Sequence, residues 1–383
     1  MQNQRHLVHL SAGTHYLNGA YKAPLLLKAE SALLKAIESE KFPMHRTVDD
    51  FFDGPAEARK LFAQLVGCDA VDVALIPSTS YGLATVLNNI SGYYGQNAVT
   101  IEGEFPSDYL SIGRWCETNE VDLKVIAPDN NETQKGQSWN EKLIAGINED
   151  TAVVVMSSVH WMNGIKFDLE AIGKKCRSVG AKFIVDGTQS VGALPMDVKR
   201  FHIDALICAS YKWMFGPYSL GLAYFGESFK MGIPLEESWM NRTNARDFSS
   251  LTKYGSEYEP GAGRYNVGES SNFILTPMLI AGLKQILAWG PENIQTYCQS
   301  LTKPLFEFLK DRGIETESDA FRAYHLFGLS LGASVDLESL RSSLSDRNIY
   351  LSVRGQSLRI SVNVYNDESD INALIEALKE NLK

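Results

Sequence analysis

The chain of 383 residues contains little cysteine, no long apolar run and no excess of positive charge. Its five cysteines are dispersed without a CxxC pair, which argues against a disulfide framework and predicts reduced thiols. The formal net charge of -10 argues against nucleic acid as the main partner, because phosphate binding needs an excess of Lys and Arg. No stretch of about eighteen apolar residues predicts a membrane span, and the N-terminus MQNQRHLVHLSAG lacks the apolar core of a signal peptide. We therefore expect a cytoplasmic protein without nucleic-acid or membrane partners, and we predict no metal site.

The middle of the chain alternates short β-rich runs with helical patterns, which predicts a mostly parallel seven-stranded sheet between helices, an α/β fold. The expected strands are Val73–Ile76, Ala98–Ile101, Leu123–Ile126, Ala152–Met156, Lys182–Val185, Ala205–Cys208 and Leu222–Phe225. A helix is expected over Asp168–Val179, with Asp168 as its cap and Gly180 as its stop.

Beyond Tyr258 the pattern changes to that of a smaller α+β unit. A long apolar helix is expected over Pro277–Trp289. The remaining elements are predicted as strand Ala323–Leu331, helix Leu337–Arg347, strand Ile349–Val353, strand Leu358–Val364 and helix Asp370–Leu382. Since a chain of this length favours two domains, we predict a large domain at 17–258 and a small domain formed by 1–16 and 259–383.

The most informative stretch runs from Phe183 to Gly221, where two buried strands each end in reactive side chains. The first delivers Asp186 and the second delivers Lys212. A carboxylate beside an amine suits pyridoxal 5'-phosphate, since the carboxylate keeps the pyridine nitrogen protonated and the amine forms a Schiff base with the aldehyde. Taken singly, Lys212 also fits a surface lysine at a strand end, and Asp186 fits the cap of a turn. Their combination favours the cofactor.

The same residues carry a family resemblance. The pattern D-x-x-Q-S-x-G, then D-x-L, then Ser210-Tyr211-Lys212-Trp213, resembles the cofactor-lysine signature of the class V aminotransferases, which are fold-type I enzymes. The resemblance implies that Lys212 is the catalytic lysine and Asp186 the pyridinium partner. It also implies that Gln189 contacts the phenolic oxygen of the cofactor, where the alternative is an ordinary turn residue.

A phosphate is best held at a helix N-terminus, where free N–H groups and the helix dipole favour an anion. The segment Pro77–Gly82 follows a predicted strand, opens a helical pattern and resembles the family's phosphate loop. Ser78, Thr79 and Ser80 are therefore expected at the phosphate, although a simple Ser/Thr cap gives the same pattern. Ser210 and Tyr211 are expected to add hydroxyls to this site.

Two further loops follow predicted strands. Phe105-Pro106-Ser107-Asp108 resembles the segment of kynureninase-like members, which makes Phe105 the expected stacking partner of the cofactor ring, the alternative being a core phenylalanine. His160 occupies the loop that the family places beside the ring. A lone histidine is more often structural, so both interpretations of His160 stay open.

The resemblance extends to the substrate side. Arg359, within L-R-I-S followed by Tyr-Asn, matches the family's carboxylate anchor, and a guanidinium suits a carboxylate in geometry and charge. Asn18 and His45 lie in segments that resemble the substrate entrance. The resemblance also implies a homodimer with shared sites. Because Glu269 replaces the usual threonine, the contact with the partner's phosphate falls to Ser270 or is absent.

Transamination requires the fewest groups beyond Lys212, Asp186 and Arg359, so the sequence predicts a class V aminotransferase acting on a small amino acid. A lyase that cleaves a C–C or C–S bond is the main alternative. Desulfuration through a cysteine near Arg359 is disfavoured, because no cysteine follows Cys298. A non-catalytic binding protein of the same fold is disfavoured by the retained lysine, aspartate and arginine.

Overall fold

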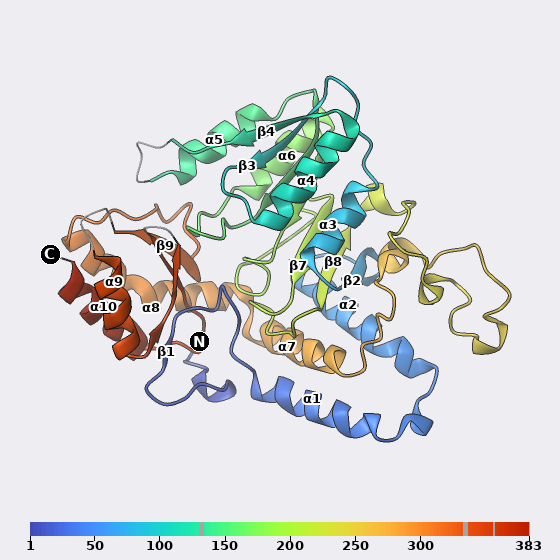
Figure 1. The fold of residues 1–383 in the computed structure, drawn as a ribbon, viewed down its shortest axis with the longest axis horizontal. Coiled ribbons are helices and arrows are strands. Elements are labelled where there is room, and N and C mark those ends of the chain that lie inside the picture. Colours follow the sequence, from blue (N-terminus) through green and yellow to red (C-terminus); the bar gives the residue numbers. More distant parts are fainter. Residues whose placement is uncertain (130–133, 332–335, 355–356, 383) are drawn as a thin grey trace.

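A seven-stranded sheet forms the centre of the computed structural model, which describes residues 1–129, 134–331, 336–354 and 357–382 (Figure 1). The strand order is β2-β8-β7-β6-β5-β3-β4. β8 pairs antiparallel with both neighbours and the other pairings are parallel. The strands are β2 (Val73–Ile76), β3 (Asn97–Ile101), β4 (Asp122–Ile126), β5 (Thr151–Ser157), β6 (Lys182–Asp186), β7 (Ala205–Ala209) and β8 (Gly221–Phe225). The predicted mostly parallel sheet is confirmed, with each strand end within one residue of the prediction.

Helices cover both faces of this sheet. Alternate residues of β6 face opposite sides, since Phe183 and Val185 join one apolar cluster and Ile184 joins another. Both faces are therefore buried, as a parallel sheet requires. The helices of this part are α1 (Leu27–Glu40), α2 (Asp53–Val66), α3 (Thr79–Leu87), α4 (Pro106–Asn119), α5 (Gly136–Gly146), α6 (Leu169–Val179) and α7 (Leu275–Trp289). The expected cap of α6 is present, because Asp168 accepts from Ala171 N at 3.0 Å and Gly180 has φ 81°.

The C-terminal part contains a three-stranded antiparallel sheet in the order β11-β12-β9. Its elements are α8 (Pro291–Asp311), β9 (Leu326–Ser330), α9 (Leu337–Asp346), β10 (Ile349–Tyr350), β11 (Ser352–Arg354), β12 (Ser357–Ser361) and α10 (Glu368–Asn381). The single strand predicted over Ile349–Val353 is wrong. The chain first pairs with β1 (His15–Tyr16) and then turns to pair with β12, so it divides at Leu351.

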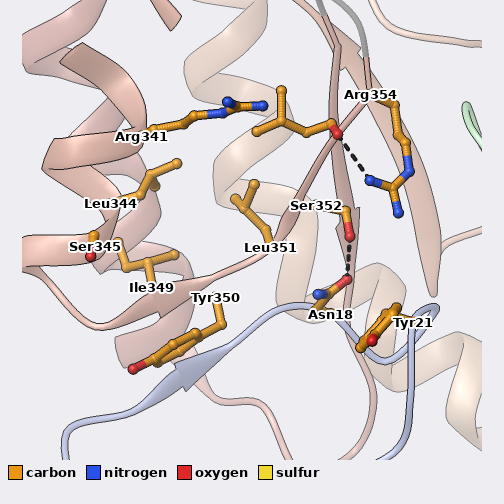
Figure 2. Close-up of a pocket in the computed structure, with 11 residues that line it drawn as sticks. Asn18, Tyr21, Arg341, Leu344, Ser345, Ile349, Tyr350, Leu351, Ser352 and Arg354 are labelled. Carbon is orange, nitrogen blue, oxygen red and sulfur yellow. Dashed lines mark hydrogen bonds between the residues drawn. The ribbon is translucent and has the colours of Figure 1, made fainter. Parts of the chain in front are cut away.

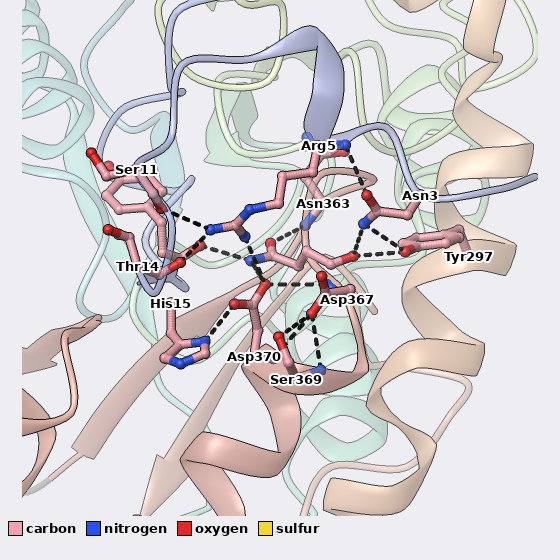
Figure 3. Close-up of polar contacts among 12 residues, drawn as sticks. Asn3, Arg5, Ser11, Thr14, His15, Tyr297, Asn363, Asp367, Ser369 and Asp370 are labelled. Carbon is pink, nitrogen blue, oxygen red and sulfur yellow. Dashed lines mark hydrogen bonds and ion pairs between the residues drawn. The ribbon is translucent and has the colours of Figure 1, made fainter.

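The N-terminal segment is tied to α10 by the buried carboxylate of Asp370 (Figure 3). His15 Nδ1 lies 2.7 Å from one oxygen, and Arg5 lies 3.5 Å from the other. The predicted domain boundary at residue 258 stays a prediction. Helix α7 follows this boundary in the chain and packs against helices α1 and α2, which belong to the same part of the molecule as the large sheet. None of the helices within the described ranges has the length and apolar character needed to cross a bilayer.

Candidate active site

Six strands of the large sheet end at the same edge. β3, β4, β5, β6 and β7 run parallel, and β2 shares their direction because both β2 and β7 are antiparallel to β8. Ligands of open α/β sheets bind outside the carboxyl ends of the strands. The topology thus brings the segments that follow these strands to one edge, and they carry most of the predicted cofactor residues.

A cavity of about 470 Å³ opens at this edge, and we call it the active-site cavity. Its aromatic lining residues are Tyr21, Phe105, Trp161, Tyr211 and Tyr218. Its polar and charged lining residues are Lys22, Gln189, Lys212, Arg354 and Arg359. The structure therefore brings Phe105, Gln189, Tyr211, Lys212 and Arg359 together as the sequence predicted, and it adds five residues that sequence reasoning missed.

Lys212 is the buried amine of the cavity, with 7% of its surface exposed. Its Nζ lies 5.6 Å from the centre of the Phe105 ring and 5.5 Å from that of Tyr211. Burial lowers the pKa of Lys212 to about 8, with Arg359 adding to this effect and Asp186 opposing it. A larger fraction of the amine is thus deprotonated near neutral pH than in an exposed lysine, which favours nucleophilic attack on an aldehyde.

Asp186 ends β6 and is fixed by the turn that follows it. Its Oδ1 accepts from Thr188 N at 2.7 Å, and Thr188 Oγ1 accepts from Ala209 N at 3.0 Å. The turn therefore joins the end of β6 to the end of β7, three residues before Lys212. This arrangement explains how the carboxylate and the amine come to adjacent strand ends.

Two more buried carboxyl groups, Glu104 and Asp108, were not predicted as site residues. Glu104 accepts from the backbone N–H groups of Phe105 and Ser157, both at 2.6 Å. Burial raises the pKa of Glu104 to about 7. Burial also raises the pKa of Asp108 well above its usual range, and the charges of Asp186 and Glu104 add to this. Three buried carboxyl groups thus lie close to one another behind the strand ends, and burial disfavours the charged form of Asp108.

Gln189 is held from two sides. Its Nε2 donates to the carbonyl of Ala20 at 3.2 Å, and its Oε1 accepts from the indole of Trp213 at 3.0 Å. The backbone carbonyl of Gln189 accepts from His325 Nε2 at 2.7 Å. These contacts fix its amide in the cavity wall, and its contact with the cofactor stays a prediction.

His160 is buried and does not line the active-site cavity. Its Nε2 donates to the carbonyl of Gly103 at 3.1 Å, and its ring packs 5.2 Å from Trp139. Burial lowers the pKa of His160 to about 4, so the ring is neutral. The next residue, Trp161, lines the cavity instead and meets Phe105 edge to face at 5.7 Å.

The N-terminus of α3 carries the predicted phosphate residues. Ser78 Oγ accepts from Tyr81 N at 3.2 Å and lies 3.0 Å from Ser80 Oγ, so Ser78 caps the helix. The N–H groups of Thr79 and Ser80 belong to the first turn, where a helix offers no internal acceptors. Ser210 Oγ instead donates to Leu220 O at 2.6 Å and to Pro217 O at 3.0 Å. Its role at the phosphate stays a prediction that this geometry does not support.

Arg359, in β12, projects into the cavity from the C-terminal part and is 3% exposed. Its guanidinium donates to the carbonyl of Trp161 at 3.3 Å and to Ser352 Oγ at 3.2 Å. Ser352 in turn donates to Asn18 Oδ1 at 2.8 Å (Figure 2). Burial lowers the pKa of Arg359 to about 10, and the charge of Arg354 adds to this. Arg359 Nε has no partner among the described residues.

Two predicted substrate residues, Asn18 and His45, and the predicted phosphate residue Ser270 lie outside the active-site cavity. Asn18 lines an adjoining cavity of about 490 Å³ (Figure 2). It contacts Arg359 only through Ser352. His45 is exposed and stacks on Phe42 at 5.7 Å. Ser270 is buried beyond Glu269, whose φ is 58°. The binding roles of all three stay predictions.

Comparison with known proteins identifies the family. The protein-family model described as aminotransferase class V matches residues 22–374 of this chain. The chain belongs to the class V aminotransferase family. Pyridoxal 5'-phosphate is accordingly its cofactor. An uncharacterized aminotransferase, YcbU of Bacillus subtilis, is 22% identical over 71% of this chain and 73% of its own. The cysteine desulfurase IscS of Shewanella sediminis is 24% identical over 90% of this chain and 89% of its own.

Solved structures show the same fold. The cystine C–S lyase C-DES, in complex with its product cysteine persulfide, aligns with a TM-score of 0.86 and 19% identity, covering 97% of this chain and 99% of its own. A cysteine desulfurase from Thermococcus onnurineus aligns with a TM-score of 0.83 and 19% identity, covering 99% and 98%. The predicted fold-type I architecture is confirmed.

The residues at the sheet edge fit the cofactor. Lys212 Nζ stands in the cavity beside the Phe105 ring, and no hydrogen bond to another described residue engages it. Asp186 would face the pyridine nitrogen, Phe105 the ring, and the first turn of α3 the phosphate. An amine, an aromatic ring and the N–H groups of a helix N-terminus thus lie at one edge of the sheet. They suit the aldehyde, the pyridine ring and the phosphate of the cofactor, respectively.

Proposed function

We propose that the protein is a pyridoxal-phosphate-dependent aminotransferase that acts on an amino acid. The observation that carries this proposal is the meeting of Lys212 and Arg359 in one cavity, since one is a buried amine and the other a buried guanidinium. An amino-acid substrate needs both, because its carboxylate must be held while its Cα–H bond is broken.

The bound cofactor supplies an electron sink for the negative charge that develops at the substrate Cα. Arg359 would bind the substrate carboxylate and thereby fix the orientation of Cα. Lys212 would take the proton from Cα, for which a pKa of about 8 is well placed. Asp186 would hold a proton at the pyridine nitrogen, and the aromatic lining would exclude water. Amino transfer needs no protein group beyond these.

A lyase acting at the β-carbon is the second candidate. The likeness to a cystine C–S lyase favours it, as do the three tyrosine hydroxyls of the cavity, because bond cleavage at Cβ needs a proton donor near the leaving atom. Burial raises the pKa of Tyr211, so that hydroxyl keeps its proton. None of the five cysteines lines the active-site cavity, so we do not propose sulfur transfer to a protein cysteine.

We also propose a cytoplasmic homodimer, in which Ser270 approaches the partner's phosphate site.

The decisive experiment incubates the purified yellow holoenzyme with an amino-acid panel that includes L-cystine, without any keto acid. One equivalent of keto acid per site, with conversion of the cofactor to its amine form, supports the aminotransferase. Catalytic release of pyruvate or sulfur species supports the lyase. A protein that stays colourless with added pyridoxal phosphate and shows no borohydride-stable adduct at Lys212 contradicts both.

A further inference from the structure

Arg354 stands beside Arg359 in the active-site cavity and has no part in the reaction described above. In the hairpin of β11 and β12, Ser352 lies opposite Arg359 and Arg354 lies opposite Ser357. Since alternate residues of a strand share a face, Arg354 lies on the same face as Ser352 and Arg359. Diagonal neighbours of this kind are roughly 7–8 Å apart. The cavity thus presents two guanidinium groups side by side.

The donors of Arg354 are largely unused. Its Nη1 donates to the carbonyl of the preceding residue, Val353, at 3.0 Å, and its side chain is half-buried (Figure 2). Neither Arg354 nor Arg359 forms an ion pair with any carboxylate of the described ranges, and no Asp or Glu is among the residues that line the cavity. A guanidinium carries five N–H donors in a planar fork. Most of those of Arg354 are therefore available to a ligand.

The pair is electrostatically unfavourable without a ligand. Two like charges repel more strongly in a partly desolvated cavity than in water, and the charge of Arg354 is the second cause, after burial, of the lowered pKa of Arg359. One carboxylate on Arg359 would neutralise only half of this charge. Lys22, which also lines the cavity, is exposed, and Lys212 is committed to the cofactor. A second anionic group on the substrate would neutralise the remainder.

We propose that Arg354 binds the distal carboxylate of a dicarboxylic amino acid whose α-carboxylate is held by Arg359. This assignment of substrate class rests on the function proposed above and applies to the aminotransferase and the lyase alike. The planar fork of a guanidinium matches a carboxylate in a bidentate fashion. Two anchors on neighbouring diagonal positions suit carboxylates separated by two or three carbons, as in aspartate and glutamate.

The first test uses acids that cannot react. Glutarate and butyrate are titrated into the holoenzyme, and the dissociation constants are measured by calorimetry. We expect glutarate to bind more tightly by about 10- to 150-fold, the effect of one hydrogen bond to a charged group. Arg354→Gln should abolish this preference, and Arg354→Lys should keep part of it.

The control is Arg341→Gln. Arg341 is an exposed arginine that lines the adjoining cavity but not the active-site cavity (Figure 2). This variant should retain the preference for glutarate. Equal binding of the two acids by the wild-type protein, or the same loss in Arg341→Gln as in Arg354→Gln, overturns the proposal.

The second test measures kcat/KM for aspartate, glutamate, alanine, cysteate and phosphoserine. Arg354→Gln should lower the value for the two dicarboxylic amino acids by 10-fold or more and leave alanine within about 3-fold. Stronger, Arg354-dependent selection of cysteate or phosphoserine would overturn the assignment of a carboxylate. Turnover of alanine alone would overturn the subsite and leave the proposed enzyme intact. If no amino acid alters the absorption of the cofactor, the proposed function fails, and glutarate binding still reports on the subsite.

Discussion

Lys212 and Arg359 face the same cavity, but different kinds of structure hold them. Lys212 follows a central strand of the seven-stranded sheet, and the buried carboxyl groups of Asp186 and Asp108 and the Thr188 turn lie near it. Arg359 stands on a small hairpin and is oriented by one carbonyl and by the hydroxyl of Ser352. The sheet side is fixed by backbone topology, whereas the hairpin side depends on a few side-chain contacts. Changes on the sheet side should therefore abolish the chemistry, and changes on the hairpin side should alter substrate affinity.

The largest expected effect belongs to Lys212→Ala. Turnover should fall by at least about 10²–10⁴-fold, because the proton at Cα loses its acceptor. Borohydride should no longer fix the cofactor to the protein, which mass spectrometry measures. Lys22→Ala is the matched control, since Lys22 lines the same cavity from an exposed position and should change kcat by less than about 3-fold. A borohydride adduct that persists in Lys212→Ala would contradict the assignment.

A second effect of Lys212 is on stability in the cofactor-free protein. The unfolded chain keeps the Lys212 proton up to a pKa of about 10.5, whereas the folded protein releases it near pH 8. Between these values the unfolded state binds more protons, so stability rises with pH. Relative to Lys212→Met, the wild-type free energy of unfolding should increase across this window by roughly 3 kcal/mol. Urea titrations at pH 7, 9 and 10.5 measure this, and a difference that does not change with pH would show that Lys212 is not buried.

The residues of the sheet side were largely predictable from the sequence, whereas those of the hairpin side were not. Asp186 ends one strand and Lys212 follows another by three residues. The apolar runs of both strands are evident in the sequence, and parallel strands bring their carboxyl ends to one edge. Arg354 and Trp161 depend on how a hairpin and a loop are placed in three dimensions. The division of Ile349–Val353 between two pairings also depends on tertiary contacts, because its residues suit either sheet.

His160 illustrates the limit of a family pattern. Its position after β5 was predicted correctly, but its ring contacts Gly103 and Trp139 and does not line the active-site cavity. Asp108 shows the converse, since it lies in the segment Phe105–Asp108 and its burial was not predicted; the same holds for Glu104, which directly precedes this segment. The direction of the strands in the sheet shows which loops reach the active site. The burial of the side chains then decides which residues of each loop line the cavity.

On the hairpin side, Arg359→Gln should raise KM for the amino acid by about 10- to 150-fold, because one charged hydrogen-bonding partner is lost. The effect on kcat should be smaller, since Lys212 and Asp186 remain in place. Steady-state kinetics at saturating and limiting substrate separate the two parameters. Arg341→Gln is again the control. A loss in kcat as large as the loss in kcat/KM would indicate that Arg359 acts on the chemical step.

The smallest effect should come from Ser352→Ala. Ser352 contacts Arg359 and Asn18 with its hydroxyl, so its loss should let the guanidinium sample other orientations. A single hydrogen bond of this kind contributes about 0.5–1.5 kcal/mol, which corresponds to a rise in KM of about 2- to 13-fold with kcat nearly unchanged. Asn18→Ala should give a similar but weaker change, since Asn18 acts on Arg359 only through Ser352. Ser345→Ala removes a hydroxyl from the same adjoining cavity that has no contact with Arg359 and should leave KM unaltered. An equal rise in KM for Ser345→Ala and Ser352→Ala would contradict this prediction. It would mean that substrate affinity depends on the packing of the whole hairpin and that Ser352 does not position Arg359.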